Sequence, residues 1–374
     1  MRYFTVTHPQ DVPQLFPTEC TLAVHGIPPR QKLSLTRNRD SQLKKILLAM
    51  KILSAPSPAL YDFEPSGAGK FFDELFLGLS QNPKSIPSKF LYDKTGSELF
   101  DQICCLDEYY PTRTEVLILR NNVAEISTLF GSDCRLIELG SGSSAKTRIL
   151  LDHLHEPAAY VPIDIAGDHL LQSTARLARV YPELCITPVC ADFTGALTLP
   201  ESSYSTKRTV AFFPGSTIGN LEPLEAEKFL RRIAILCGAG GGLLIGVDLK
   251  KDRPTLERAY NDARGITAAF NLNLLTRINR AFSAGIRDDQ FQHYAFYNEE
   301  FGRIEMHLVS LADQTAQLNG TRFVFGQGEH IITEYSYKYA VQEFAKLAAR
   351  SGWTVKRLWT DAAKLFSVQY LEVR

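Results

Sequence analysis

The sequence predicts an α/β protein built on a doubly wound, mostly parallel sheet. Between about residues 114 and 248, short apolar runs alternate with amphipathic segments, which predicts parallel strands covered by helices on both faces. A glycine-rich turn follows the first apolar run, and a polar residue stands at the end of each. Ligands bind at the carboxyl ends of such strands, so the same pattern predicts a binding site along one edge of the sheet.

The composition is that of an ordinary globular protein. The 374 residues are 45% hydrophobic and 22% charged, and this length predicts two domains or one domain with a large insertion. Lys+Arg and Asp+Glu are both 41, so no net charge attracts nucleic acid or an anionic membrane. No apolar run approaches the roughly 18 residues that span a bilayer. The first residues lack the apolar core of a signal peptide, and we expect a cytoplasmic protein.

Neither the cysteines nor the histidines predict a metal site. The seven cysteines are scattered without a C-x-x-C pair, which favours reduced thiols. His153 and His155 form the only tight histidine pair, and on a predicted helix residues two apart do not share a face.

Residues 1–68 are the hardest part to interpret. Prolines divide the first thirty residues into short pieces, and Ser41–Leu53 then predicts one amphipathic helix. A Ser/Pro-rich linker follows. We expect an N-terminal extension, to which the sequence assigns no chemistry.

The next segment carries an unusual set of tyrosines. Phe71–Leu79 predicts a helix, and two polar blocks around Tyr92 and Tyr109 combine tyrosine with glycine or proline. Aromatic rings with hydroxyl groups suit a small polar ligand. A role in the core explains these residues equally well when they are considered alone.

The predicted strands lead to the residues with the clearest chemistry. Five are expected in the alternating region, at Arg135–Leu139, Tyr160–Asp164, Leu184–Val189, Arg208–Phe213 and Gly242–Asp248. The first runs into Glu138-Leu139-Gly140-Ser141-Gly142. Gly140 and Gly142 let the backbone approach a bound molecule closely, and the helix that follows directs its free N–H groups at this turn.

Two nucleotide cofactors fit this loop. As G-x-G-x-x-A, with Asp164 about twenty positions later, it could bind a dinucleotide. Glu138, however, would gain nothing beside a pyrophosphate, whereas a cofactor with a sulfonium and a free amino group favours a nearby carboxylate. The arrangement resembles the first motif of class I S-adenosylmethionine (SAM)-dependent methyltransferases. A purely structural turn is the third interpretation.

The other strand ends favour SAM. Asp164 suits the two ribose hydroxyls, which are donors. Asp192 can accept from the adenine amine while Phe193 packs against the ring. Asn220 can donate to a carboxylate, although a helix N-cap before Pro223 explains it as well.

Residues 249–340 interrupt the alternation. We expect a long helix from Thr255 to about Phe282, strands at Arg303–Ser310 and Thr321–Phe325, and an extended stretch from His330. In that stretch Glu334 and Ser336 project from one face, which a solvated strand would also explain. A helix ending at Arg350 and two strands, Trp353–Trp359 and Leu365–Val373, close the chain. Such a closing hairpin is typical of class I methyltransferases, so the insertion splits the catalytic sheet in sequence.

Several ordered blocks together resemble the histidine-specific SAM-dependent methyltransferases, the family of the L-histidine Nα-methyltransferase of ergothioneine biosynthesis. The resemblance covers about residue 70 to the C-terminus. The blocks are Tyr92-Asp93, Gly96–Asp101, Glu108–Arg113, Glu138–Gly142, Gly215–Asn220, Ala259-Tyr260, Thr267–Asn271, Arg303–Met306 and Thr333-Glu334-x-Ser336.

The resemblance implies a class I fold with a seven-stranded sheet and a second, α+β substrate-binding domain. The SAM-binding domain would comprise residues 114–248 and 340–374, and the substrate-binding domain residues 69–113 and 249–339. The implied reaction is SAM-dependent Nα-trimethylation of L-histidine to hercynine.

The resemblance also implies a role for individual residues. Tyr92 is the candidate catalytic residue, because it would hydrogen-bond and orient the amino group. Asn220 and Tyr260 would hold the α-carboxylate, and Glu334 and Ser336 would contact the imidazole. The remaining substrate-binding positions would be Phe100, Tyr109, Thr267 and Met306. The cofactor would be bound by Glu138, Gly140, Gly142, Lys146, Asp164, Asp192, Phe193 and Gly215.

Three alternatives remain open at this stage. A methyltransferase of the same family could act on tryptophan or a prenylated tryptophan, although an indole could not use both Glu334 and Ser336. A non-catalytic SAM-binding protein is less consistent with an intact set of pocket residues. A nucleic-acid methyltransferase is disfavoured by zero net charge. We expect a small amino-acid substrate, no nucleic-acid or membrane partner, and a monomer.

Overall fold

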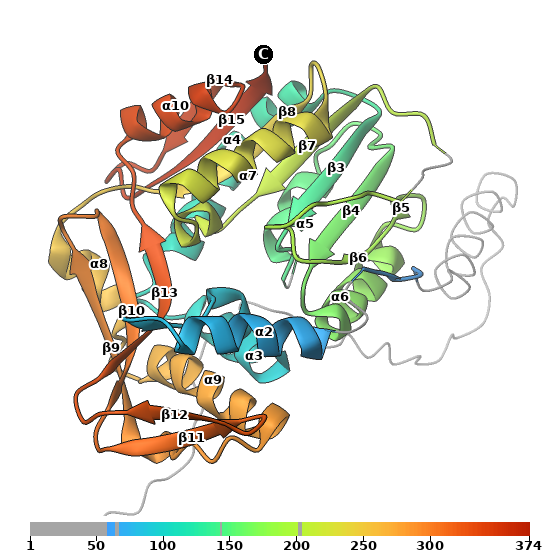
Figure 1. The fold of residues 1–374 in the computed structure, drawn as a ribbon. Helices are drawn as coiled ribbons and strands as arrows, with labels where there is room; N and C mark the ends of the chain where they lie inside the picture. The colour runs from blue at the N-terminus through green and yellow to red at the C-terminus, as the bar shows by residue number, and fades with distance from the viewer. Residues whose placement is uncertain (1–57, 64–66, 143, 201–203) are drawn as a thin grey trace, which may run out of the picture. The chain divides into compact units, whose positions relative to one another are not determined.

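The computed structural model describes residues 58–63, 67–142, 144–200 and 204–374. The helix expected at Ser41–Leu53 lies outside these residues. The main sheet runs in the order β1-β6-β4-β3-β7-β8-β15-β14, with β5 paired to β4. Its strands are parallel except for β15, which is antiparallel to both β8 and β14. The doubly wound, mostly parallel sheet is therefore confirmed (Figure 1). Within the described residues it has nine strands where seven were expected, and the short strands β1 and β5 account for the difference.

The strand bounds agree closely with the predictions. The parallel strands are β3 (Cys134–Leu139), β4 (Ala159–Asp164), β7 (Arg208–Phe213) and β8 (Gly242–Asp248), with β1 (Tyr61–Asp62) and β6 (Val189–Cys190) beyond β4. The strand predicted at Leu184–Val189 is instead divided into β5 (Cys185–Ile186) and β6. The break falls at Thr187 and Pro188, where proline has no N–H to donate to a neighbouring strand.

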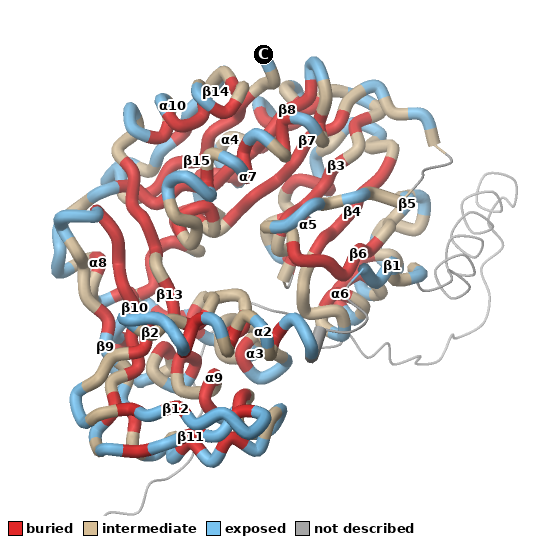
Figure 2. Tube along the Cα trace, viewed as in Figure 1, coloured by how far each residue is buried: buried red, intermediate tan, exposed pale blue. Residues whose placement is uncertain are grey.

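Alternate residues of the parallel strands face opposite layers of helices, as the period of two requires. Ile137 and Leu139 belong to one buried cluster, with residues of α7 (Pro223–Cys237) and α10 (Val341–Arg350). Cys134 and Leu136 belong to another cluster, with residues of α4 (Tyr110–Phe130), α5 (Ala145–Leu151) and α6 (Gly167–Val180). The four long parallel strands, β3, β4, β7 and β8, are consequently buried on both faces (Figure 2), whereas the short edge strand β1 is exposed. The closing hairpin forms as predicted from β14 (Trp353–Thr360) and β15 (Phe366–Val373).

The insertion builds a second sheet. It has the order β2-β13-β10-β9, from β2 (Lys84–Ser85), β13 (His330–Tyr337), β10 (Arg303–Ser310) and β9 (Phe291–Asn298). A separate hairpin pairs β11 (Gln314–Leu318) with β12 (Thr321–Phe325). One buried cluster joins residues between Phe71 and Tyr110 to residues between Leu256 and Ile331. The segment before the main sheet and the insertion thus share a hydrophobic core.

The long helix expected from Thr255 to about Phe282 is wrong as a single element. It is divided into α8 (Arg253–Tyr260) and α9 (Ile266–Phe282). The Asp262 carboxylate accepts the backbone N–H groups of Ile266, at 2.9 Å, and Thr267, at 2.8 Å. This satisfies donors at the first turn of α9 and explains why a new helix begins there.

Four further helical elements contact the second sheet or α9. They are α2 (Gly67–Leu79), the 3-10 helix η1 (Ser88–Leu91), α3 (Lys94–Ile103) and the 3-10 helix η2 (Thr217–Asn220). Gly219 of η2 lies directly against β13, because a Cβ added to it would be 2.6 Å from the Tyr337 carbonyl oxygen. Only glycine allows this close approach.

Candidate active site

The glycine loop takes its shape from Asp164. Gly140 and Gly142 both have positive φ, +74° and +46°, in the region that favours glycine. The Asp164 carboxylate accepts the backbone N–H groups of Gly142, at 3.0 Å, and Ala166, at 2.9 Å. Burial raises the pKa of Asp164 even though these donors oppose the shift. Asp164 therefore links the end of β4 to the loop after β3.

Glu138 supports the same loop from inside the protein. Its carboxylate accepts the hydroxyl of Thr147, at 2.5 Å, and the hydroxyl of Tyr160. Burial raises the pKa of Glu138 to about 7, and the two hydroxyls oppose this shift. Each carboxylate oxygen thus already has a donor within the protein.

Lys146 and Gly215 are held together by Glu115, a residue that the sequence analysis did not select. Glu115 is fully buried on α4. It accepts the Gly215 N–H at 2.9 and 3.0 Å, and lies 2.5 Å from the Lys146 ammonium. Burial alone would lower the pKa of Lys146, but the Glu115 carboxylate reverses this and raises it. Lys146 consequently stays charged beside the end of β7.

Asp192 and Phe193 lie together at the edge of the main sheet. Asp192 lies 2.8 Å from the Lys89 ammonium and accepts the Thr194 N–H at 2.9 Å. Burial opposes ionisation, but these partners prevail and lower the pKa of Asp192 to about 2. Phe193 lies beside the glycine loop, since a Cβ on Gly140 would be 3.5 Å from its ring.

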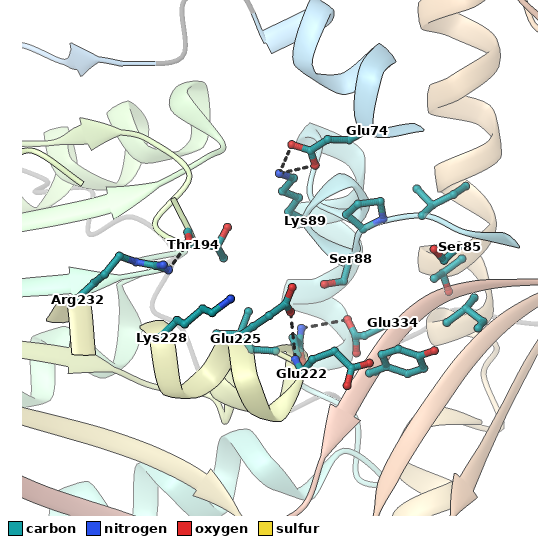
Figure 3. A pocket seen from close by; sticks show the side chains of 17 residues that line it. Glu74, Ser85, Ser88, Lys89, Thr194, Glu222, Glu225, Lys228, Arg232 and Glu334 are labelled. Atoms are coloured by element: carbon teal, nitrogen blue, oxygen red, sulfur yellow. Dashed lines mark hydrogen bonds and ion pairs between the residues drawn. The ribbon is translucent and has the colours of Figure 1, made fainter. Parts of the chain in front are cut away.

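A pocket of about 510 Å³ opens beside this edge. Two of the predicted substrate residues, Asn220 and Glu334, line it. The Asn220 amide donates to the Glu334 carboxylate at 3.4 Å. Figure 3 shows Glu334 on β13, with Lys228 and Arg232 of α7 across the pocket. Burial raises the pKa of Glu334 to about 7, although Lys338 and Asn220 oppose the shift.

Three predicted residues share one face of the second sheet. Met306 pairs with Glu334 across β10 and β13, and Ser336 lies two residues further along β13. Directly paired residues, and residues two apart on a strand, project on the same side. All three are buried. The alternative that Glu334 and Ser336 belong to a solvated strand face is therefore excluded.

The predicted aromatic residues meet in one cluster. Tyr92 lies 5.4 Å from both Phe100 and Phe270, and Tyr109 lies 6.2 Å from both Phe100 and Tyr260, between ring centroids. Most of these contacts are edge-to-face, the arrangement that aromatic rings prefer. Burial raises the pKa of Tyr92 well above its usual value, and the nearby Glu334 adds to the shift. The Tyr92 hydroxyl therefore keeps its proton.

A buried polar network continues from Ser336 toward β8. The Ser336 hydroxyl accepts from the Tyr260 hydroxyl at 2.8 Å and from the Lys338 ammonium at 2.6 Å. Lys338 lies 3.0 Å from Asp248, which also pairs with Lys251 at 2.6 Å. The sequence analysis missed Lys338 and gave Asp248 no role. The available signal was the alternation of Glu334, Ser336 and Lys338 on one face of a strand.

The predicted substrate residue Thr267 has a buried hydroxyl that makes no hydrogen bond within the described part of the chain. Thr267 lies in the first turn of α9. The Ser141 hydroxyl, on the glycine loop, is buried and unpartnered in the same sense. Among the residues that the structure describes, no group of three or more His, Cys, Asp or Glu side chains could hold a metal ion.

Comparison with known proteins identifies the family. The family model described as histidine-specific methyltransferase, SAM-dependent, matches residues 71–373. A histidine N-alpha-methyltransferase of Mycolicibacterium smegmatis is 41% identical over 297 residues, which are 78% of this chain and 91% of that protein. The chain belongs to this histidine-specific, SAM-dependent methyltransferase family.

Three further proteins are similar to this chain. A histidine N-alpha-methyltransferase of Mycobacterium tuberculosis is 41% identical over 79% of this chain and 92% of its own length. Ergothioneine biosynthesis protein 1 of Neurospora crassa is 30% identical over 74% of this chain, but only 32% of that longer protein is matched. A solved SAM-dependent methyltransferase from Clostridium acetobutylicum has a TM-score of 0.43 and 9% identity, over 73% of this chain and 97% of that one.

SAM is accordingly the cofactor of this methyltransferase. The chain's own residues fit it, because the glycine loop carries the unpartnered Ser141 hydroxyl and lies beside the Phe193 ring. The charged Lys146 lies beside the end of β7, and the charged Asp192 follows the end of β6. None of the helices in the described ranges is both long and apolar enough to cross a membrane.

Proposed function

We propose that this enzyme transfers methyl groups from SAM to the α-amino nitrogen of L-histidine and continues to the trimethylated betaine, hercynine. Relatives named histidine N-alpha-methyltransferase, at 41% identity over more than three quarters of the chain, support the substrate. The observation that carries the proposal is the pair Glu334 and Ser336, buried on one face of β13. A carboxylate and a hydroxyl at this spacing suit the two nitrogens of an imidazole.

The rest of the amino acid would occupy the space between Asn220 and the aromatic cluster. Asn220 would hold the α-carboxylate, since its amide has two donors and only one is directed at Glu334. Phe100, Tyr109, Tyr260, Thr267 and Met306 would line the substrate pocket. Tyr92 would accept from or donate to the amine and orient it.

The cofactor would lie along the edge of the main sheet. When bound, SAM supplies an electrophilic methyl group on a sulfonium centre. Asp164 would take the ribose hydroxyls, and Asp192 and Phe193 the adenine. Gly140, Gly142, Glu138, Lys146 and Gly215 would surround the remainder, which agrees with the positive φ of the glycines and the charge of Lys146.

The chemistry requires little covalent work from the protein. The neutral amine would use its lone pair to form the new N–C bond while the S–C bond breaks and S-adenosylhomocysteine leaves. The first two products would each lose an N–H proton to water before the next transfer, and the third would remain as the quaternary ammonium of the betaine. Holding the amine in line with the methyl group would supply much of the rate enhancement. Because the raised pKa of Tyr92 keeps its hydroxyl protonated, Tyr92 would act by orienting the amine and not as a phenolate base.

We further propose that residues 69–113 and 249–339 are the substrate-binding domain and that 114–248 with 340–374 is the SAM-binding domain. The hydrophobic cluster shared by the first two segments supports this division. Residues 1–68 would be an extension, of which Tyr61–Asp62 pairs with β6. We propose a cytoplasmic monomer that acts on a free amino acid and has no nucleic-acid or membrane partner.

Tryptophan is the second candidate substrate. The aromatic cluster around Tyr92 could accept an indole, and an L-tryptophan methyltransferase of Psilocybe serbica is 25% identical over 76% of this chain. An indole has one N–H and no second ring nitrogen, so it would leave Ser336 or Glu334 without a ring partner. Histidine satisfies both.

The test is a methylation assay of the purified full chain with SAM and each of the twenty amino acids, followed by mass spectrometry. Histidine is expected to give products heavier by one, two and three methyl groups, ending at hercynine. Turnover of tryptophan without turnover of histidine would disprove the substrate assignment and leave the cofactor assignment intact.

A further inference from the structure

Lys338 is a fully buried cation next to the proposed imidazole site, and no role has been assigned to it. Its side chain has no exposed surface. A lysine ammonium has three N–H donors, and Lys338 has three acceptors: Asp248 at 3.0 Å, Tyr260 at 3.1 Å and Ser336 at 2.6 Å. Burial would lower the pKa of Lys338, but Asp248 overrides this and raises it. The cation is therefore fully hydrogen-bonded and permanently charged.

These contacts determine what Ser336 can do. A serine hydroxyl has two acceptor lone pairs and one donor. In Ser336 both lone pairs are used, by the Lys338 ammonium at 2.6 Å and by the Tyr260 hydroxyl at 2.8 Å. The Tyr260 hydroxyl in turn accepts from Lys338, so its own proton is available for Ser336. The only function left to Ser336 is to donate its proton.

Glu334 has the opposite hydrogen-bonding role to Ser336, because it accepts. A carboxylate is an acceptor only. Burial raises the pKa of Glu334 to about 7, and the positive charge of Lys338 opposes this shift, so Glu334 is ionised above that pH. Glu334 and Ser336 project from the same face of β13. That face therefore presents one acceptor and one donor. A neutral imidazole is complementary, because one of its nitrogens carries a proton and the other is bare.

We propose that Lys338 is a positioning residue that fixes Ser336 as a hydrogen-bond donor, so that the pocket selects a neutral imidazole by its bare nitrogen. This inference rests on the proposed function, because it assumes that histidine is the substrate. The inference adds to the proposed function the protonation state of the imidazole that binds and the residue that imposes this choice.

The first experiment uses the unaltered protein. Binding of L-histidine, L-β-(pyrrol-2-yl)alanine and L-β-(pyrrol-3-yl)alanine is measured by calorimetry in the presence of S-adenosylhomocysteine. A pyrrole keeps the N–H for Glu334 but lacks the bare nitrogen. The better pyrrole should bind roughly tenfold more weakly than histidine or worse. Equal binding would overturn the inference, whatever the variants do.

The second experiment tests Lys338 itself. In Lys338→Met the Ser336 hydroxyl regains a free lone pair, so the preference for histidine over the pyrrole should fall to about twofold, with KM for SAM unchanged. Asp248 keeps Lys251 and the Tyr110 hydroxyl as partners, and thermal unfolding checks that the variant is folded. Lys250→Met is the matched control, because Lys250 pairs with Glu343 at the surface.

A double-mutant cycle separates action through Ser336 from a general structural effect. If Lys338 acts through Ser336, then Lys338→Met should change histidine binding by less than about twofold in a Ser336→Ala background. Independent, multiplying effects would overturn the inference, as would an equal rise in KM for SAM. Failure of the unaltered protein to bind histidine would instead overturn the proposed function, and this inference with it.

Discussion

The Lys146 ammonium lies 2.5 Å from the Glu115 carboxylate, and the same carboxylate accepts the backbone N–H of Gly215. One buried acid on α4 thus fixes two of the proposed cofactor-binding residues, which stand about seventy positions apart in the chain. Neither partner is adjacent to Glu115 in sequence. The contact makes Glu115 a positioning residue for the cofactor.

Replacing Glu115 by Gln should leave Lys146 buried without its counter-ion. We expect the free energy of unfolding to fall by about 3 kcal/mol, the order of magnitude for breaking a buried ion pair, and KM for SAM to rise more than KM for histidine. Chemical denaturation and initial-rate kinetics measure the two effects. Glu125→Gln, on the same helix, removes an exposed ion pair with Arg357 and should change neither quantity appreciably. Equal effects of the two substitutions would contradict the role of Glu115.

Replacing Glu334 by Ala should remove the acceptor for the imidazole N–H. Losing the partner of a buried polar group can cost several orders of magnitude in specificity, so kcat/KM for histidine should fall on the order of a hundredfold or more, while KM for SAM changes little. Glu225→Ala tests an acid that lines the same pocket, and we expect it to alter KM for histidine by less than about twofold. A parallel loss of affinity for both substrates would mean that Glu334 is structural.

The activity should fall as the pH drops through 7. Burial raises the pKa of Glu334 to about 7, so protonation below that pH removes the acceptor that histidine needs. The imidazole of histidine itself titrates near pH 6.5, and L-β-(1,2,4-triazol-3-yl)alanine, a much weaker base, removes this second titration. The break near pH 7 should persist with the triazole and disappear in Glu334→Gln, which should keep only the uniform slope due to protonation of the substrate α-amino group. A decline of unchanged shape in that variant would assign it to another group.

Replacing Gly140 by Ala should separate backbone strain from cofactor contact. Its φ of +74° costs a residue with a side chain about 1–2 kcal/mol. Gly131 has the same φ and open space around it, so Gly131→Ala should also lose stability. Only Gly140→Ala should also raise KM for SAM, because its methyl group would stand beside Phe193 in the proposed cofactor site. Unchanged SAM kinetics in Gly140→Ala would place the cofactor elsewhere.

Local patterns were sufficient for most of the main sheet. β7 and β8 have the predicted bounds, because continuous apolar runs flanked by polar residues define buried parallel strands. Two element boundaries were predicted wrongly, because in each case a single residue interrupts a longer hydrophobic pattern. Pro188 divides a predicted strand, and Asp262 begins a new helix inside a stretch of continuous helical periodicity.

The candidate site was predictable where its chemistry is local. Alternation along a strand places Glu334 and Ser336 on one face, but a solvated face would explain that as well, and the resemblance to the family selected them. Lys89 could not be selected, since only the folded chain brings it 2.8 Å from Asp192, more than a hundred residues away. Glu115 was missed for the same reason, because a buried acid within a helix has no local signature until its partners are known.

The contact between Gly219 and Tyr337 restricts how the substrate range of this enzyme can change during evolution. With 2.6 Å between a hypothetical Cβ and the Tyr337 carbonyl oxygen, β13 cannot shift relative to η2 without losing the glycine's fit. The backbone of β13, which carries Glu334 and Ser336, therefore has a fixed position relative to η2. We expect specificity for new amino-acid substrates to arise by substitution of side chains on β13. Grafting β13 from a relative should succeed only when the glycine equivalent to Gly219 is transferred as well.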